Sequence, residues 1–121
     1  MDFQLDNNLP IWPQLLARMT ERILTRRYPP GSKLPSVREL ALEAGVNPNT
    51  MQRALSQLEA NGLVTTNRTA GRVVTEDESA LETVRERLAQ ERIAQYFAGM
   101  AKIGYDEQAA AALLAQRKER E

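Results

Sequence analysis

Proline and glycine divide the first 62 residues of this chain into three short segments with helical patterns. Across residues 11–27, apolar side chains recur every four positions from Ile11 to Ile23, which is typical of one buried helix face. Residues 28–31 read Tyr-Pro-Pro-Gly, and proline disfavours helix at its own position and at the one before it. The sequence therefore predicts a first helix over residues 11–27.

The second segment opens with a capping pattern. Ser36 followed three residues later by Glu39 is a capping box, in which each side chain bonds the backbone N–H of the other residue. We expect a helix from this point to about Glu43. A tight turn follows over residues 44–46, where Gly45 is available for a positive φ.

The third helix begins with an unusually polar first turn. Asn47 suits the N-cap and Pro48 suits the first helical position, while residues 61–62, Asn-Gly, mark the end. These polar groups offer hydrogen-bond donors and acceptors to bases and phosphates. The plainer alternative is a solvated helix start with ordinary surface residues. At 100° per residue, four of them lie on or beside the face opposite the apolar one: Asn49, Thr50, Gln52 and Arg53.

Two short β-branched runs follow, at residues 63–66 and 72–75, and the segment 67–71 between them is rich in turn-forming residues. This pattern predicts a β-hairpin. Two helices, a short turn, a third helix and a hairpin form the order of a winged helix-turn-helix, in which the third helix enters the DNA major groove. There, Asn and Gln side chains pair with adenine and Arg pairs with guanine.

The sequence from residue 76 to residue 121 predicts two more helices, separated near Gly104, which form a helical extension after a first domain over residues 1–75. The apolar stripe of this extension is more than two such helices bury well alone. We therefore expect a homodimer, the alternative being a tail that packs on its own winged domain. The predicted dimerisation residues are Leu81, Val84, Leu88, Ile93, Phe97 and Met100.

Composition excludes several classes of function. The chain has neither cysteine nor histidine, so it lacks thiolate chemistry and the commonest general base and metal ligand. We expect no enzyme, no cofactor and no metal site, and we interpret the acidic residues 76–78 as a favourable helix start. No apolar run approaches the ~20 residues of a membrane span, and the N-terminus lacks the features of a signal peptide. We expect a cytoplasmic protein without a membrane partner.

Four ordered motifs resemble the N-terminal DNA-binding domain of GntR-type bacterial transcription regulators. They read P-I-x-x-Q-L from residue 10, P-G-x-x-L-P-S-x-R-x-L-A from residue 30, G-V-N-P-N-T-x-x-R-A from residue 45 and L-E-x-x-G-L-V from residue 58. The resemblance covers about residues 10–75. The short tail resembles that of the small YtrA-like subfamily, in which two helices replace larger effector domains.

The resemblance implies a dimeric repressor that binds double-stranded DNA at an inverted-repeat operator. It implies a major-groove or phosphate contact by Arg38, a backbone contact by Ser36, and a wing tip at Gly71 that approaches the minor groove or its phosphates. The wing has one glycine where the family usually has G-x-G, so Arg68 and Arg72 either supply contacts there or are plain solvated charges. The residues that fall at the start of the recognition helix are Asn47, Asn49, Thr50 and Gln52.

A different function remains open from the sequence, namely a winged-helix module that docks protein without reading DNA. Residues 1–75 carry nine Lys or Arg against six Asp or Glu, a net charge of +3, whereas residues 76–121 carry −3. A basic first part favours a polyanionic partner. A protein-docking face would instead show apolar residues at the exposed positions of the third helix. An unidentified small-molecule effector stays an open class of partner.

Overall fold

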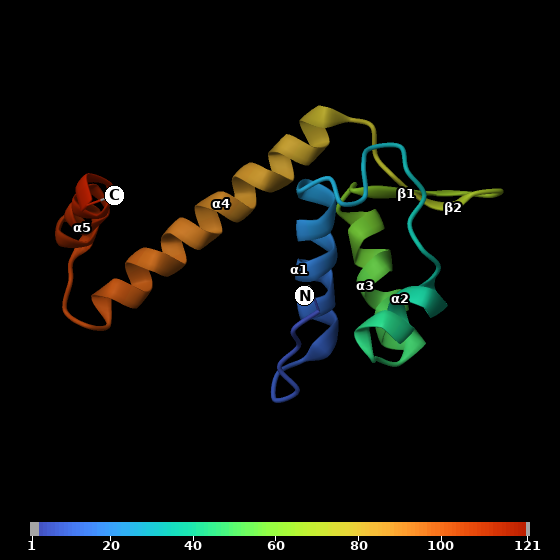
Figure 1. Ribbon diagram of the computed structural model, residues 1–121, viewed down its shortest axis with the longest axis horizontal. Coiled ribbons are helices and arrows are strands. Elements are labelled where there is room, and N and C mark those ends of the chain that lie inside the picture. Colours follow the sequence, from blue (N-terminus) through green and yellow to red (C-terminus); the bar gives the residue numbers. More distant parts are fainter. Residues whose placement is uncertain (1–2, 121) are drawn as a thin grey trace. The chain divides into compact units, whose positions relative to one another are not determined.

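The computed structural model describes residues 3–120, which form two compact units (Figure 1). The first unit ends at Glu82 and the second begins at Thr83. The architecture is mainly α with one β-hairpin, which confirms the predicted fold class. Among the described residues, no helix is both long and apolar enough to cross a membrane.

Three helices form the core of the first unit: α1 (Ile11–Leu24), α2 (Val37–Ala44) and α3 (Pro48–Ala60). Figure 1 shows α1 and α3 side by side, with α2 near one end of α3 and the hairpin at the other. The apolar faces that periodicity predicts meet here and exclude water. The largest buried side chains of these helices are Leu15, Met19, Ile23, Leu40, Met51, Leu55 and Leu58.

Helix α1 ends three residues earlier than the predicted residue 27. Arg26 has a left-handed backbone with φ of 63°, and its N–H donates to the carbonyl of Ile23. The N–H of Arg27 donates to the carbonyl of Arg22, so the two bonds form a Schellman motif. A non-glycine residue in this conformation leaves no signal in the sequence, which explains the error in the predicted end.

The predicted helix starts of α2 and α3 are confirmed. Both bonds of the Ser36–Glu39 capping box are present, and Gly45 closes α2 with φ of 71°. Asn47 caps α3 because its Oδ1 accepts the N–H of Asn49 at 2.7 Å, and Pro48 occupies the first position. Gly45 and Asn47 therefore set the two ends of the turn between α2 and α3.

The hairpin consists of β1 (Val64–Asn67) and β2 (Gly71–Val74), paired antiparallel with Val64 opposite Val74. Both strands are shifted by one residue from the predicted runs, because Asn67 and Gly71 pair across the turn. Residues 31–34 also line β2: Leu34 donates its N–H to the carbonyl of Arg72 at 2.9 Å. The sequence patterns did not predict this second pairing, which anchors the wing to the loop before α2.

Helix α4 (Glu78–Ala101) begins in the first unit and continues into the second, which also contains α5 (Glu107–Arg120). The carboxylate of Asp77 accepts the N–H groups of Ser79 and Ala80. The hydroxyl of Ser79 donates to the same carboxylate and is the largest cause of the lowered pKa of Asp77. The two N–H groups act in the same direction. The acidic start of α4 therefore caps the helix, and the compact units divide inside α4.

Within the second unit, the phenol of Tyr96 donates to the carbonyl of Ala110 at 2.6 Å and so joins α4 to α5. The ring of Tyr96 also meets that of Phe97 edge to face, with centroids 5.2 Å apart. Asp106 caps α5 by accepting the N–H of Ala109, and Gly104 in the connection has φ of 98°. A partly buried hydrogen bond thus joins the two helices of this unit.

Candidate nucleic-acid interface

The polar face predicted for the third helix is exposed in α3. Asn49, Gln52 and Arg53 are exposed, while Thr50 is half-buried at the flank. The amide of Gln52 donates to the hydroxyl of Ser56, one turn further along, at a long 3.4 Å. Because the opposite face of α3 is buried, this face is the one that the helix presents outward.

Asn47 stabilises the start of α3 through its side chain and its backbone. Its Oδ1 accepts the N–H of Asn49, and its backbone carbonyl accepts the N–H of Thr50 at 3.0 Å. The side-chain NH₂ group of Asn47 donates no hydrogen bond within residues 3–120. The Oδ1 atom of Asn47 therefore stabilises the first turn, while the two N–H groups of its side chain remain available to a partner outside the chain.

The arginines of the first unit fall into two groups. Five of them lie within 4 Å of a carboxylate: Arg18, Arg22, Arg26, Arg27 and Arg72. The other three have neither hydrogen bond nor ion pair in the described part of the chain: Arg38, Arg53 and Arg68. These three stand on α2, on α3 and at the hairpin turn, which are the elements that meet DNA in a winged helix-turn-helix.

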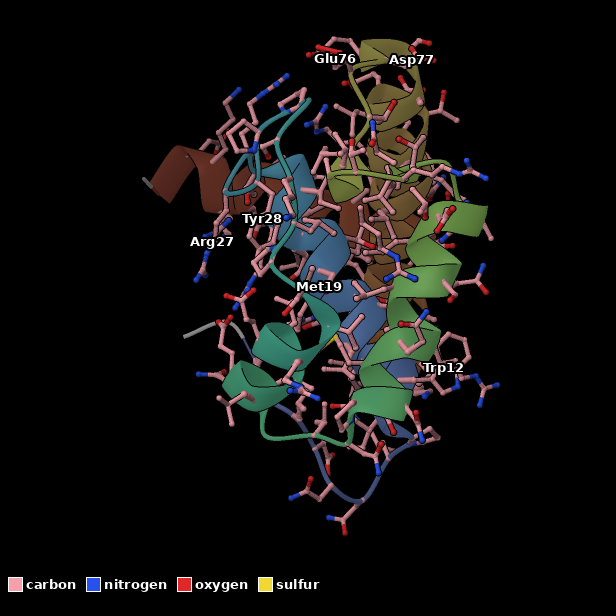
Figure 2. All side chains as sticks on the ribbon, turned by 90° about the vertical axis from the view of Figure 1, so that its right-hand side faces the viewer. Trp12, Met19, Arg27, Tyr28, Glu76 and Asp77 are labelled. Atoms are coloured by element: carbon pink, nitrogen blue, oxygen red, sulfur yellow. The ribbon has the colours of Figure 1, made fainter. Side chains whose placement is uncertain are left out.

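Arg53 has an aromatic partner instead of an acidic one. Its guanidinium carbon lies 4.4 Å from the ring centroid of Trp12, which is half-buried on α1. Figure 2 shows Trp12 beside α3, on the opposite side of α1 from Arg27 and Tyr28. Helical periodicity predicts an exposed Arg53 but not this contact, because it identifies a face and not its neighbours.

The tip of the wing is organised by Asn67, in a role that the sequence pattern does not predict. Oδ1 of Asn67 accepts the N–H and the hydroxyl of Thr69, both at 2.9 Å, and the N–H of Ala70 at 3.2 Å. Gly71 then adopts φ of 84°, a conformation that other residues rarely reach. One asparagine and one glycine thus shape the turn, and Arg68 is exposed at its end.

Arg72 is placed differently from Arg68. Its side chain is only 18% exposed, and its Nε lies 3.7 Å from a carboxylate oxygen of Glu59 on α3. That distance is an ion pair but too long for a hydrogen bond. Glu59 also accepts the hydroxyl of Thr66 on β1 at 2.8 Å. Arg72 and Thr66 therefore tie the wing to the end of α3, which sequence reasoning did not foresee.

The start of α2 faces the wing across a hollow of about 250 Å³ that is lined by Lys33, Ser36 and Gly71, among others. Ser36 donates its backbone N–H to the carboxylate of Glu39, and this bond, followed by that to the Ser36 hydroxyl, lowers the pKa of Glu39. The positive charge of Lys33 acts in the same direction. Lys33 adds a basic group to this surface that the motif-based prediction omitted.

A nearly buried arginine fixes α2 against α1. Arg22 is 3% exposed, and its guanidinium donates to the carboxylate of Glu43 and to the phenol of Tyr28, each at 2.5 Å. The ring of Phe3 lies 4.0 Å from the guanidinium carbon. Burial alone would lower the pKa of Arg22, but the bonds to Glu43 and Tyr28 outweigh it and raise that pKa. This cluster positions the first helix of the turn motif without touching its outer face.

The predicted dimerisation residues differ in exposure. Leu81 and Val84 are 2% and 5% exposed in the single chain. Ile93 is 48% exposed, and the remaining three predicted residues are half-buried. Three further apolar side chains of the second unit are exposed and were not predicted: Ile103, Tyr105 and Leu114.

Known bacterial regulatory proteins are similar to this chain in sequence and fold. The family described as bacterial regulatory proteins, gntR family, matches residues 13–74, from α1 to the end of β2. The HTH-type transcriptional repressor YtrA of Bacillus subtilis is 36% identical over 78% of this chain and 77% of its own length. A GntR family transcriptional regulator from Listeria monocytogenes has a TM-score of 0.83 at 33% identity, covering 93% of this chain and 98% of that one.

The fold is also similar to that of a DNA-binding domain solved with its operator. The DNA-binding domain of AraR in complex with operator ORE1 has a TM-score of 0.53 at 25% identity, and it covers 62% of this chain and 94% of that chain. The share that matches is about the size of the winged first unit.

Proposed function

This chain belongs to the gntR family of bacterial regulatory proteins, in its small YtrA-like branch, and it is a DNA-binding transcriptional regulator; we propose that it is a homodimeric repressor of an inverted-repeat operator. The observation that carries the proposal is the separation of the arginines into paired and unpaired groups. Charges without a carboxylate partner are available to phosphates and bases. We place its action in the cytoplasm, where the DNA of a bacterium lies.

In the proposed complex, the exposed face of α3 enters the major groove. Asn49 and Gln52 present carboxamides that suit adenine, and Arg53 presents a fork that suits guanine. Thr50 and the free donors of Asn47 stand at the same end of α3. Each good bidentate pair supplies ~1–3 kcal/mol of discrimination against the wrong base.

The flanking elements position α3 through the DNA backbone. Arg38 and the hydroxyl of Ser36 stand at the start of α2, where helix N–H groups also attract phosphate. At the wing, Arg68 and the backbone of Gly71 approach the minor groove or its phosphates. Arg72 serves indirectly in this scheme, because it holds the wing on α3 through Glu59.

The second unit supplies the dimer contact in this proposal. Leu88, Ile93, Phe97 and Met100 retain surface that a second copy would cover, whereas Leu81 and Val84 are already buried in one chain. A two-fold dimer matches two half-sites that lie one helical turn, ~34–36 Å, or a multiple of it apart. The repressor assignment rests on the name of the related YtrA protein.

Selection from randomised duplex DNA at physiological salt tests the proposal. The purified full chain should enrich an inverted repeat, and the spacing of its half-sites should report the geometry of the dimer. A reporter gene placed behind the enriched site should then be transcribed less when the chain is expressed. If no sequence is enriched, sequence-specific DNA binding is rejected and the protein-docking alternative is favoured. If the enriched site is a single half-site, the dimer is rejected.

A further inference from the structure

Trp12 lies outside the elements that meet DNA in the proposed complex, yet it contacts one of the proposed DNA-reading side chains. The guanidinium carbon of Arg53 lies 4.4 Å from the centroid of the indole ring. This distance is within the range of a cation–π interaction, and Trp is the ring that gives the strongest one. The contact joins α1 to the second turn of α3.

The chemistry of this contact differs from that of the paired arginines. A carboxylate partner accepts the N–H donors of a guanidinium and cancels its charge, as Glu43 does for Arg22. An aromatic face attracts the cation from above or below the guanidinium plane. The five N–H donors lie in that plane, so the ring does not occupy them. Within residues 3–120 the indole is the partner of Arg53, and no hydrogen bond or ion pair competes with it.

The ring stands on a helix that packs in the core. Helix α1 packs on α3. Leu15 and Met19 of α1 are fully buried, and Trp12 stands one turn before Leu15 on the same helix. Arg53 stands four residues after Asn49, so both lie on the outward face of α3. The indole thus stands on a packed helix, beside the face that is proposed to read bases.

We propose that Trp12 is a positioning residue, which holds the guanidinium of Arg53 ready for a DNA acceptor while leaving all its donors free. A free arginine side chain loses much rotamer freedom when it binds, and a side chain that is already held loses less. Trp12 therefore strengthens and sharpens the contact that Arg53 makes. The inference rests on the proposed function, since it requires that α3 read DNA.

A double-mutant cycle on the full chain tests this role, with the duplex enriched in the selection as the ligand. Trp12→Leu should weaken binding by about threefold to tenfold, and Trp12→Phe, which keeps a ring, should recover part of that loss. In the Arg53→Ala background, Trp12→Leu should change the dissociation constant by less than about twofold. Trp12→Leu should also relax base preference only at the positions that Arg53→Ala relaxes.

The outcomes separate the two proposals. If Trp12→Leu weakens binding equally with and without Arg53, or if it has no effect, the positioning role is overturned while sequence-specific binding stands. If the wild-type chain enriches no sequence, the proposed function fails and the positioning role falls with it. Trp12 is the single tryptophan of the chain, so its fluorescence offers a check on the free protein: Arg53→Ala should change the indole emission before DNA is added. Thermal unfolding of each variant excludes loss of folding as the cause.

Discussion

Replacing Glu43 by Gln should destabilise the first unit, because it weakens the interactions of a nearly buried cation. Arg22 is 3% exposed, whereas its partner Glu43 is 38% exposed. Breaking a fully buried pair costs about 3–5 kcal/mol, and an exposed pair contributes about 0–1 kcal/mol. Since one partner is screened by water and Arg22 keeps Tyr28 and Phe3, we expect a loss of about 1–3 kcal/mol in the free energy of unfolding.

The pH dependence of this loss follows from the carboxylate. The hydrogen bond from Arg22 and the nearby positive charges outweigh burial and lower the pKa of Glu43 from its ordinary value of 4.5. A carboxyl with a lowered folded pKa stabilises the protein above its unfolded pKa and loses that contribution as the pH falls through the folded pKa. The gap between wild type and Glu43→Gln should therefore be full at pH 7 and shrink below about pH 4.5.

Urea unfolding followed by circular dichroism at pH 7 and pH 3 measures this gap. Glu21→Gln is the matched control, because Glu21 pairs with Arg18 on the surface of α1 at 3.1 Å. That control should lose less than about 1 kcal/mol at either pH. Equal losses in the two variants, or a gap in Glu43→Gln that does not depend on pH, would refute the reasoning.

Three further predictions concern the dimer, the turn motif and the wing. Leu88→Asp should produce monomers in light scattering while Gln90→Asp, at an exposed position of the same helix, keeps the dimer; a dimeric Leu88→Asp would remove this stripe from the interface. Gly45→Ala should lower the free energy of unfolding by about 1 kcal/mol, because its φ is 71°. Gly99→Ala, in α4, should instead raise it by up to about 1 kcal/mol. Calorimetry should show changes of opposite sign in the two variants. Asn67→Ala should weaken operator binding in a mobility-shift assay with little change in melting temperature, because it releases only the wing tip; unchanged affinity would exclude the wing from the interface.

Sequence reasoning succeeded where local chemistry decides the structure. The starts of α2 and α3 follow from Ser36 with Glu39 and from Asn47 with Pro48, residues whose capping bonds lie within one turn. The buried faces follow from the spacing of apolar residues alone. Such features need no knowledge of distant neighbours, and the order of elements that they define was enough to indicate the winged architecture.

The same reasoning failed where distant residues decide the structure. The pairing of residues 31–34 with β2 joins segments about forty positions apart, and no local pattern marks it. The partners of Arg53 and Arg72, namely Trp12 and Glu59, also become visible only once the helices and the hairpin are assembled. The sequence pattern does not distinguish Arg68 from Arg72. In the structure, Arg68 is exposed without a partner among residues 3–120, whereas Arg72 is mostly covered.

The division of arginines into paired and unpaired groups is the central claim, and two triple variants of equal charge test it. One replaces Arg38, Arg53 and Arg68 by alanine. The other replaces three arginines that lie near carboxylates, namely Arg18, Arg26 and Arg27. Each variant lowers the net charge by three, so a difference between them reports position and not overall electrostatics.

The measurement is the dissociation constant for the enriched duplex between 50 and 200 mM salt, as a function of salt concentration. The first variant should lose at least about 100-fold in affinity, and its logarithmic salt slope should fall by about 0.9 for each phosphate contact removed. The second variant should stay within about threefold of wild type with the same slope. Equal losses in both variants, or a larger loss in the second, would contradict the assignment of α2, α3 and the wing as the surface that reads DNA.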